Sequence, residues 1–265
     1  MDTPDVDRMR EFYESCDVYE GCLARRGPER FRDYVELVGG CATPGDRMLD
    51  AGCGLGQALG LLREHGLEAV GIDLAERFLR VARRSGLPVV TADLARLPFA
   101  DECFQVVGCY EVVEHLLDIE SALRSVWAAL RCGGVACIRV DNYCSVTRIR
   151  ERARRKRRRG SRLPLALLTA LEAVRGFWQT LIIVLSGRPV MASVPPLLGP
   201  GWQHEDDVVW ASHPLTVTRL LRNLGAAVEL RPNPSDTRLK RLARRLLWHF
   251  GPGYWVVARK PNRAA

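Results

Sequence analysis

Short apolar runs alternate with segments of helical periodicity between residues 46 and 140. Each run has the length of a buried strand, and the segments between the runs repeat apolar residues every three or four positions, as an amphipathic helix does. This alternation predicts a parallel sheet with crossover helices. The strands are expected at 47–50, 68–72, 88–91, 104–109 and 134–140, and the helices at 56–65, 75–84 and 119–131.

The pattern differs on either side of this stretch. Aromatic and aliphatic residues are spaced among charges near the N-terminus and predict helices, in which Tyr13 or Tyr19 could line a site or simply pack. A helix at 214–224 and strands at 227–231 and 254–259 would complete the sheet. We therefore expect four regions, which are a helical cap at 1–40, a sheet core at 41–143, a helical insertion at 144–203 and the rest of the core at 204–265.

The insertion combines a basic run with an apolar helix. Residues 148–162 contain ten basic residues and one acid, so the net charge of +8 belongs to this run and the remainder is close to neutral. Residues 163–185 are mostly apolar but too short and too charged to predict a spanning helix. They suit a membrane-interface segment or a lid over a lipophilic substrate. A narrow polar stripe of this helix would hold Glu172, Arg175, Gln179 and Ser186.

A glycine-rich turn follows the first strand. Asp50 ends an apolar run, and Gly52, Gly54 and Gly56 alternate after it. Glycine allows positive φ and lets a ligand lie against the backbone at a helix N-terminus. The turn departs from the dinucleotide pattern G-x-G-x-x-G because Gln57 stands at the third glycine. The pattern D-x-G-x-G-x-G instead resembles motif I of the class I S-adenosylmethionine (SAM) dependent methyltransferases, where it cradles the amino-acid end of SAM.

Two further strands end in an acid. Asp73 lies about twenty residues after the glycine turn, where doubly wound folds place a carboxylate for ribose hydroxyls. Asp93 ends the next strand, and the resemblance implies that it meets the adenine amine. Each acid could instead be a helix N-cap. The resemblance implies a cofactor-binding set of Asp50, Gly52, Cys53, Gly54, Gly56, Asp73, Leu74, Asp93, Leu94 and Tyr110.

The same resemblance predicts the whole fold. It implies a Rossmann-like α/β class I methyltransferase fold with a seven-stranded, mostly parallel sheet, an antiparallel strand seven, helices on both faces and a helical insertion after strand five. It covers about 42–142 and 204–260. The run 130–135 resembles the L-x-P-G-G turn before the fifth strand, with Cys132 in place of proline. A second basic amphipathic helix is expected at 238–248.

A second group of chemical residues follows the fourth strand. Glu111, Glu114 and His115 have the spacing of one helical face, and His204 lies far downstream. These residues resemble the metal sites of the ubiquinone-pathway O-methyltransferases and the small-RNA 3′-end 2′-O-methyltransferases, where a divalent metal lowers the pKa of the acceptor oxygen. Similar residues also occur in related enzymes that bind no metal, and we consider a site without a metal the better interpretation. His115 and His204 are then candidate general bases, with Glu111 and Glu114 beside them.

Charge by itself does not identify the methyl acceptor, because the basic run would attract anionic lipids and RNA phosphates alike. The apolar helix next to it favours a small lipophilic acceptor such as a phenol, a quinone precursor or a lipid. We therefore predict a SAM-dependent methyltransferase, acting by O-methylation, with peripheral contact to an anionic membrane through 148–186. An RNA 2′-O-methyltransferase and a non-catalytic SAM-binding protein are the alternatives.

Two features of composition predict the compartment. The nine cysteines form no C-x-x-C pair, and no early segment has the charge and apolar pattern of a secretory signal. We therefore expect a cytoplasmic location.

Overall fold

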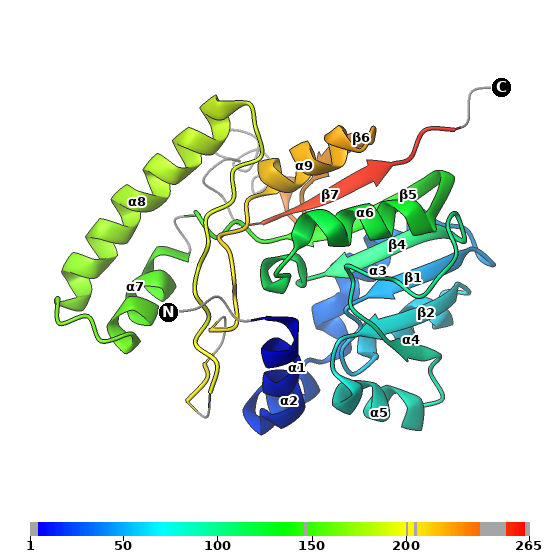
Figure 1. Cartoon of the computed structure of the whole chain (residues 1–265). Coiled ribbons are helices and arrows are strands. Elements are labelled where there is room, and N and C mark those ends of the chain that lie inside the picture. The colour runs from blue at the N-terminus through cyan, green and yellow to red at the C-terminus, as the bar shows by residue number, and fades with distance from the viewer. Residues whose placement is uncertain (1–4, 146–147, 200, 204–205, 239–252, 263–265) are drawn as a thin grey trace.

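The computed structural model describes residues 5–145, 148–199, 201–203, 206–238 and 253–262. Within these residues, seven strands form one sheet in the order β3-β2-β1-β4-β5-β7-β6 (Figure 1). The strands are β1 (Arg47–Ala51), β2 (Glu68–Asp73), β3 (Val89–Thr91), β4 (Phe104–Tyr110), β5 (Leu130–Val140), β6 (Ala227–Arg231) and β7 (Tyr254–Arg259).

The direction in which strands are added reverses at β1. The parallel strands β2 and β3 lie on one side of β1 and β4 lies on the other, whereas β7 is antiparallel to both β5 and β6. Such a reversal opens a crevice at the carboxyl ends of the strands. The predicted seven-stranded, mostly parallel sheet with an antiparallel strand seven is confirmed.

Helices cover both faces of the sheet, as expected. They are α1 (Val6–Ser15), α2 (Asp17–Ala24), α3 (Arg32–Gly39), α4 (Gln57–Glu64), α5 (Glu76–Arg84), α6 (Ile119–Ala129), α7 (Ile149–Arg158), α8 (Leu165–Ser186) and α9 (Pro214–Asn223). Because successive side chains of a strand point to opposite faces, Leu49 and Val107 join a core with α6 and α9. Their neighbours Met48 and Val106 join a second core with α3 and α4.

The predicted N-terminal cap at 1–40 forms two separate parts of the structure. α3 packs against the sheet, where Tyr34 and Val38 are fully buried, and so belongs to the core rather than to a cap. α1 and α2 lie together beside α5 (Figure 1). The side chain of Arg77 on α5 donates to the carbonyl of Glu14 and pairs with Asp17, which ties both helices to the sheet domain.

β5 is longer than the sequence suggested. It begins at Leu130 rather than at residue 134. Gly133 lies inside it with φ +76°, and the register with β4 shifts between Phe104 and Val106. The expected turn at 130–135 is therefore an irregularity within the strand.

The insertion forms a helix pair at one side of the molecule, where α7 packs against α8 (Figure 1). Of the predicted polar stripe of α8, Glu172 faces inward, whereas Arg175 and Ser186 are exposed. Glu172 is only 1 % exposed and pairs with Arg152 and Lys156 of α7. Apolar residues therefore occupy the outward side, the reverse of the arrangement usual for a surface helix. The helix expected at 238–248 lies outside the described residues except at its first position.

Candidate active site

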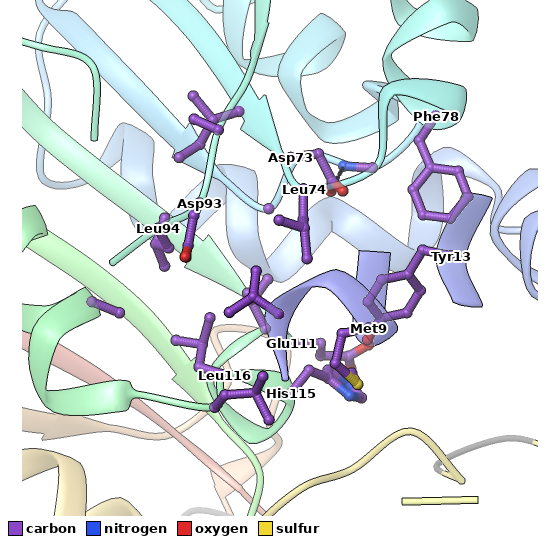
Figure 2. A pocket seen from close by; sticks show the side chains of 18 of the residues that line it. Met9, Tyr13, Asp73, Leu74, Phe78, Asp93, Leu94, Glu111, His115 and Leu116 are labelled. Atoms are coloured by element: carbon purple, nitrogen blue, oxygen red, sulfur yellow. Dashed lines mark hydrogen bonds between the residues drawn. The ribbon is translucent and has the colours of Figure 1, made fainter. Parts of the chain in front are cut away.

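A cavity lies at the carboxyl ends of β2 and β4 (Figure 2). Among the candidate residues, those that line it are Gly52, Gly54, Asp73, Leu74, Asp93, Leu94, Tyr110, Glu111 and His115, joined by Tyr13 and Tyr19. The candidates behind the wall are Asp50, Cys53, Gly56 and Glu114.

The glycine turn takes a backbone path that side chains would obstruct. Gly52 has φ +77°, and a Cβ atom there would lie 2.3 Å from Cγ2 of Val112. Gly56 has φ +83° and caps α4, where a Cβ atom would lie 2.6 Å from Leu87. The turn therefore requires glycine at both positions, and at Gly52 and Gly54 it presents bare backbone to the cavity.

Asp73 and Asp93 hold their loops at the edge of the cavity. The carboxylate of Asp73 accepts hydrogen bonds from the backbone N–H groups of Gly54 (2.9 Å) and Ala75 (3.0 Å). Asp93 accepts one from Ala95 at 2.9 Å. Neither acid is a helix N-cap, since Ala75 caps α5 and residues 92–103 contain no helix. Burial raises the pKa of Asp73, although its backbone hydrogen bonds lower it.

Asp50 lies beneath the glycine turn. Its Oδ1 accepts a hydrogen bond of 2.7 Å from the hydroxyl of Tyr34, and its Oδ2 is buried without a hydrogen-bond partner among the described residues. Burial raises the pKa of Asp50 to about 6, although the bond from Tyr34 lowers it. The side chain stabilises the end of β1 from behind.

These residues fit the cofactor that the resemblance implies. Bare backbone at Gly52 and Gly54 lets an amino-acid group approach closely. The Asp73 carboxylate can accept from ribose hydroxyls, and Leu74 and Leu94 offer apolar surfaces for a planar base. The chain thus supplies both the polar and the apolar parts of a SAM site.

The expectation that Glu111, Glu114 and His115 share one helical face is wrong. Only Val113–His115 form a short 3-10 turn, and Glu111 precedes it with φ +56°. The carboxylate of Glu111 turns toward the N-terminal region and accepts from Arg30 at 2.6 and 2.8 Å. The carboxylate of Glu111 is therefore paired with an arginine, which helical spacing cannot reveal.

Within the part of the chain that the structure describes, no group of three His, Cys, Asp or Glu side chains is placed to hold a metal ion. Glu114 is buried, and its Oε1 lies 4.0 Å from Nε2 of His115. His204, the downstream candidate, lies outside the described residues.

The structure adds a residue that sequence reasoning missed. Asp207, only 1 % exposed, lies with Oδ2 at 3.0 Å from Nδ1 of His115 and accepts from the hydroxyl of Tyr13 at 3.1 Å. Its Oδ1 accepts from the indole N–H of Trp202 at 3.0 Å. The acidic run before residue 208 was visible in the sequence, but its proximity to His115, more than ninety residues away, was not.

Comparisons with known proteins find similarity to methyltransferases. Residues 49–138 match the family model of a methyltransferase domain. The ubiquinone biosynthesis O-methyltransferase of Bordetella avium is 33% identical over 114 residues, which cover 40% of this chain and 46% of that protein. The malonyl-[acyl-carrier protein] O-methyltransferase of Serratia marcescens is 34% identical over 108 residues, covering 39% and 42%. The chain therefore matches less than half the length of these relatives.

A solved structure extends the likeness to nearly the whole fold. The crystal structure of a SAM dependent methyltransferase from Archaeoglobus fulgidus superposes with a TM-score of 0.53 at 20% identity, covering 88% of this chain and 92% of that one. At this identity the likeness establishes the fold. Residues 49–138 thus resemble a methyltransferase domain, and the chain has the Rossmann-like fold of the class I methyltransferases.

Proposed function

We propose that this protein transfers the methyl group of SAM to a small lipophilic acceptor, by O-methylation. The observation that carries the proposal is the composition of the cavity. Asp73 and Asp93 lie on one side of it, and Met9, Glu111 and His115 lie on the other (Figure 2). One cavity therefore brings carboxylates suited to SAM together with a histidine and apolar side chains.

Methyl transfer from SAM requires little covalent catalysis by the protein. Bound SAM supplies a methyl group already activated by its sulfonium. The chain must align the acceptor with that group, exclude water and remove a proton. His115 is the lining residue suited to take that proton, because an imidazole titrates near neutral pH.

The apolar end of the cavity supports a lipophilic acceptor. Its lining includes Met9, Val112, Leu116 and Leu117, and the aromatic rings of Tyr13 and Tyr19 stand nearby with centroids 5.1 Å apart. Burying apolar surface of an acceptor there contributes about 25 cal/mol per Å². The relative from Bordetella avium is named for ubiquinone biosynthesis, which is compatible with this acceptor class.

The outer face of α8 supports a peripheral membrane contact. Seven large apolar residues on α8 are between 46% and 73% exposed, namely Leu167, Leu171, Val174, Phe177, Trp178, Ile182 and Leu185. Patches of this kind on a protein surface mark interaction sites. The helix is also long and apolar enough to cross a membrane by length and composition, which is weak support for a span. Glu172, buried on its inner side, favours a helix lying in the interface.

An RNA 2′-O-methyltransferase is the second candidate, and the basic run on α7 is the observation that favours it. Only part of that run is available to phosphates. Arg152 and Arg155 are buried and donate to carbonyls of Glu172, Pro195 and Val208. These arginines stabilise the insertion, which weakens the RNA interpretation.

The test is to incubate the purified protein with methyl-labelled SAM and a membrane extract of its source organism. We expect label in the organic phase after extraction, and less label with a Gly52→Ala variant. Label recovered in RNA would favour the second candidate. SAM binding without label in any fraction, in the presence of a long-chain alkyl catechol as added acceptor, would support a non-catalytic SAM-binding protein.

A further inference from the structure

Asp207 lies directly behind His115 and does not line the cavity. It belongs to the segment by which the insertion rejoins the sheet domain, and its side chain is 1 % exposed. Oδ2 lies 3.0 Å from Nδ1 of His115. A buried carboxylate so close to a cavity-lining imidazole affects how that imidazole can react.

The surroundings of Asp207 favour its ionised form. Burial raises its pKa, but the charge of His115 and hydrogen bonds from His115 and Trp202 lower it to about 2. An ionised carboxylate only accepts hydrogen bonds. The proton of a neutral His115 is therefore held on Nδ1, and the lone pair of that tautomer is on Nε2.

We propose that Asp207 is a positioning residue that fixes the tautomer and orientation of His115 for proton removal. The inference rests on the proposed function. Tautomer control of this kind has a large effect in other enzymes that use a histidine base. Among the described residues, Glu114 also approaches the ring, but its Oε1 lies 4.0 Å from Nε2, which is too long for a hydrogen bond.

The proposed step balances as follows. The acceptor hydroxyl gives its proton to Nε2 of His115, and its oxygen forms a bond to the methyl carbon. The methyl–sulfur bond breaks, and its electron pair stays on the sulfur, so the sulfonium charge is neutralised. His115 leaves the step as an imidazolium whose Nδ1–H faces the Asp207 carboxylate, and it later loses the proton to water.

Asp207 also joins three segments that are distant in the sequence. The hydroxyl of Tyr13 on α1 donates to the same oxygen that faces His115, and Trp202 donates to the other. The rings of Tyr13 and Tyr19 pack against each other, and Tyr19 packs against Trp202 with centroids 4.9 Å apart. The N-terminal helices and the end of the insertion thus hold the carboxylate in place.

The test compares Asp207→Asn with Asp206→Asn. Asp206 is equally buried but accepts from the backbone of Gln203 and pairs with Arg158, so it is a matched control. With methyl-labelled SAM and a long-chain alkyl catechol, we expect Asp207→Asn to lower kcat about 100-fold or more. The KM for SAM should change less than about threefold, and Asp206→Asn should retain most of the activity.

A second measurement does not depend on turnover. In protein with ¹⁵N-labelled histidine, the ring shifts of His115 should identify the Nδ1–H tautomer in the wild type and a changed tautomer ratio in Asp207→Asn. Unchanged shifts, or a kcat within about threefold of the wild type, would overturn the inference. If the wild type binds SAM but does not methylate the catechol, the proposed function fails for this acceptor, and the ring shifts still decide the role of Asp207.

Discussion

At the scale of single residues, the positions of the glycine turn tolerate substitution least. Gly52 combines positive φ with a neighbouring valine side chain where its Cβ atom would be. An L-residue there must shift the backbone away from the path that leaves the cavity open. Because glycine has no side chain, the backbone at this position leaves the cavity open.

We expect Gly52→Ala to weaken SAM binding at least about tenfold, because the turn must move to relieve a 2.3 Å contact with Val112. Isothermal titration calorimetry measures this directly. Gly60→Ala is the matched control, since Gly60 lies inside α4 and a Cβ atom there would meet nothing within 4 Å. Equal SAM affinity in the two variants would contradict the prediction.

Asp50 should make stability depend on pH. Its folded pKa of about 6 lies above the unfolded value of about 3.9, so the folded state holds the proton more tightly. This contribution is fully present below about pH 4 and is lost as pH rises through about 6. Relative to Asp50→Asn, the wild-type free energy of unfolding should fall between pH 4 and 6 and then level off. Urea denaturation checks this, and a constant difference would refute it.

At the scale of elements, α8 is the clearest departure from a soluble surface helix. Its inward side carries Glu172, Gly176 and Thr180, all buried, while its outward side is apolar. A Cβ atom at residue 176 would lie 2.4 Å from Nη2 of Arg152, so glycine makes room for the arginine that pairs with Glu172. The buried polar side of α8 therefore packs against α7.

We expect the double variant Phe177→Glu/Trp178→Glu to bind vesicles of mixed phosphatidylglycerol and phosphatidylcholine at least about tenfold more weakly than the wild type. Burial of each of these side chains in lipid contributes roughly 1.5–3 kcal/mol, and the two are 49% and 55% exposed. Vesicle sedimentation measures the partition. The control Val18→Glu changes a side chain of α2 that is 50% exposed, and an equal loss in both proteins would argue against α8 as the contact.

At the scale of the whole molecule, ligand and fold are linked. The cavity is closed by α1 and α2, which are held to α5 through Arg77, and the 3-10 turn that follows α2 is held to the end of β4 through the pairing of Arg30 with Glu111. A ligand that bridges the sheet edge and these helices should therefore stabilise both together.

SAM at about one hundred times its Kd should stabilise the folded protein by about 2.7 kcal/mol. For a chain of this size that corresponds to a rise in Tm of roughly 5–10 °C. Differential scanning fluorimetry checks the shift, with Gly52→Ala at the same SAM concentration as the control, for which we expect a smaller rise. No shift in the wild type would contradict SAM binding by this cavity.

The sequence by itself determined the order and bounds of most strands and helices. The strand at 227–231 and the strand at 254–259 agree residue for residue with β6 and β7. The glycine turn and the acid at residue 73 were also found, because periodicity and turn chemistry act between near neighbours in the chain.

Tertiary structure decided what local patterns leave open. Helical spacing grouped Glu111 with His115, whereas pairing with Arg30, 81 residues away, directs that carboxylate elsewhere. The polar stripe of α8 was visible in the sequence, but contact with α7 determined that Glu172 of this stripe faces inward. Asp207 reaches His115 only because the chain returns to the sheet after the insertion. In each case a contact between distant segments decided the outcome, and periodicity carries no information about such contacts.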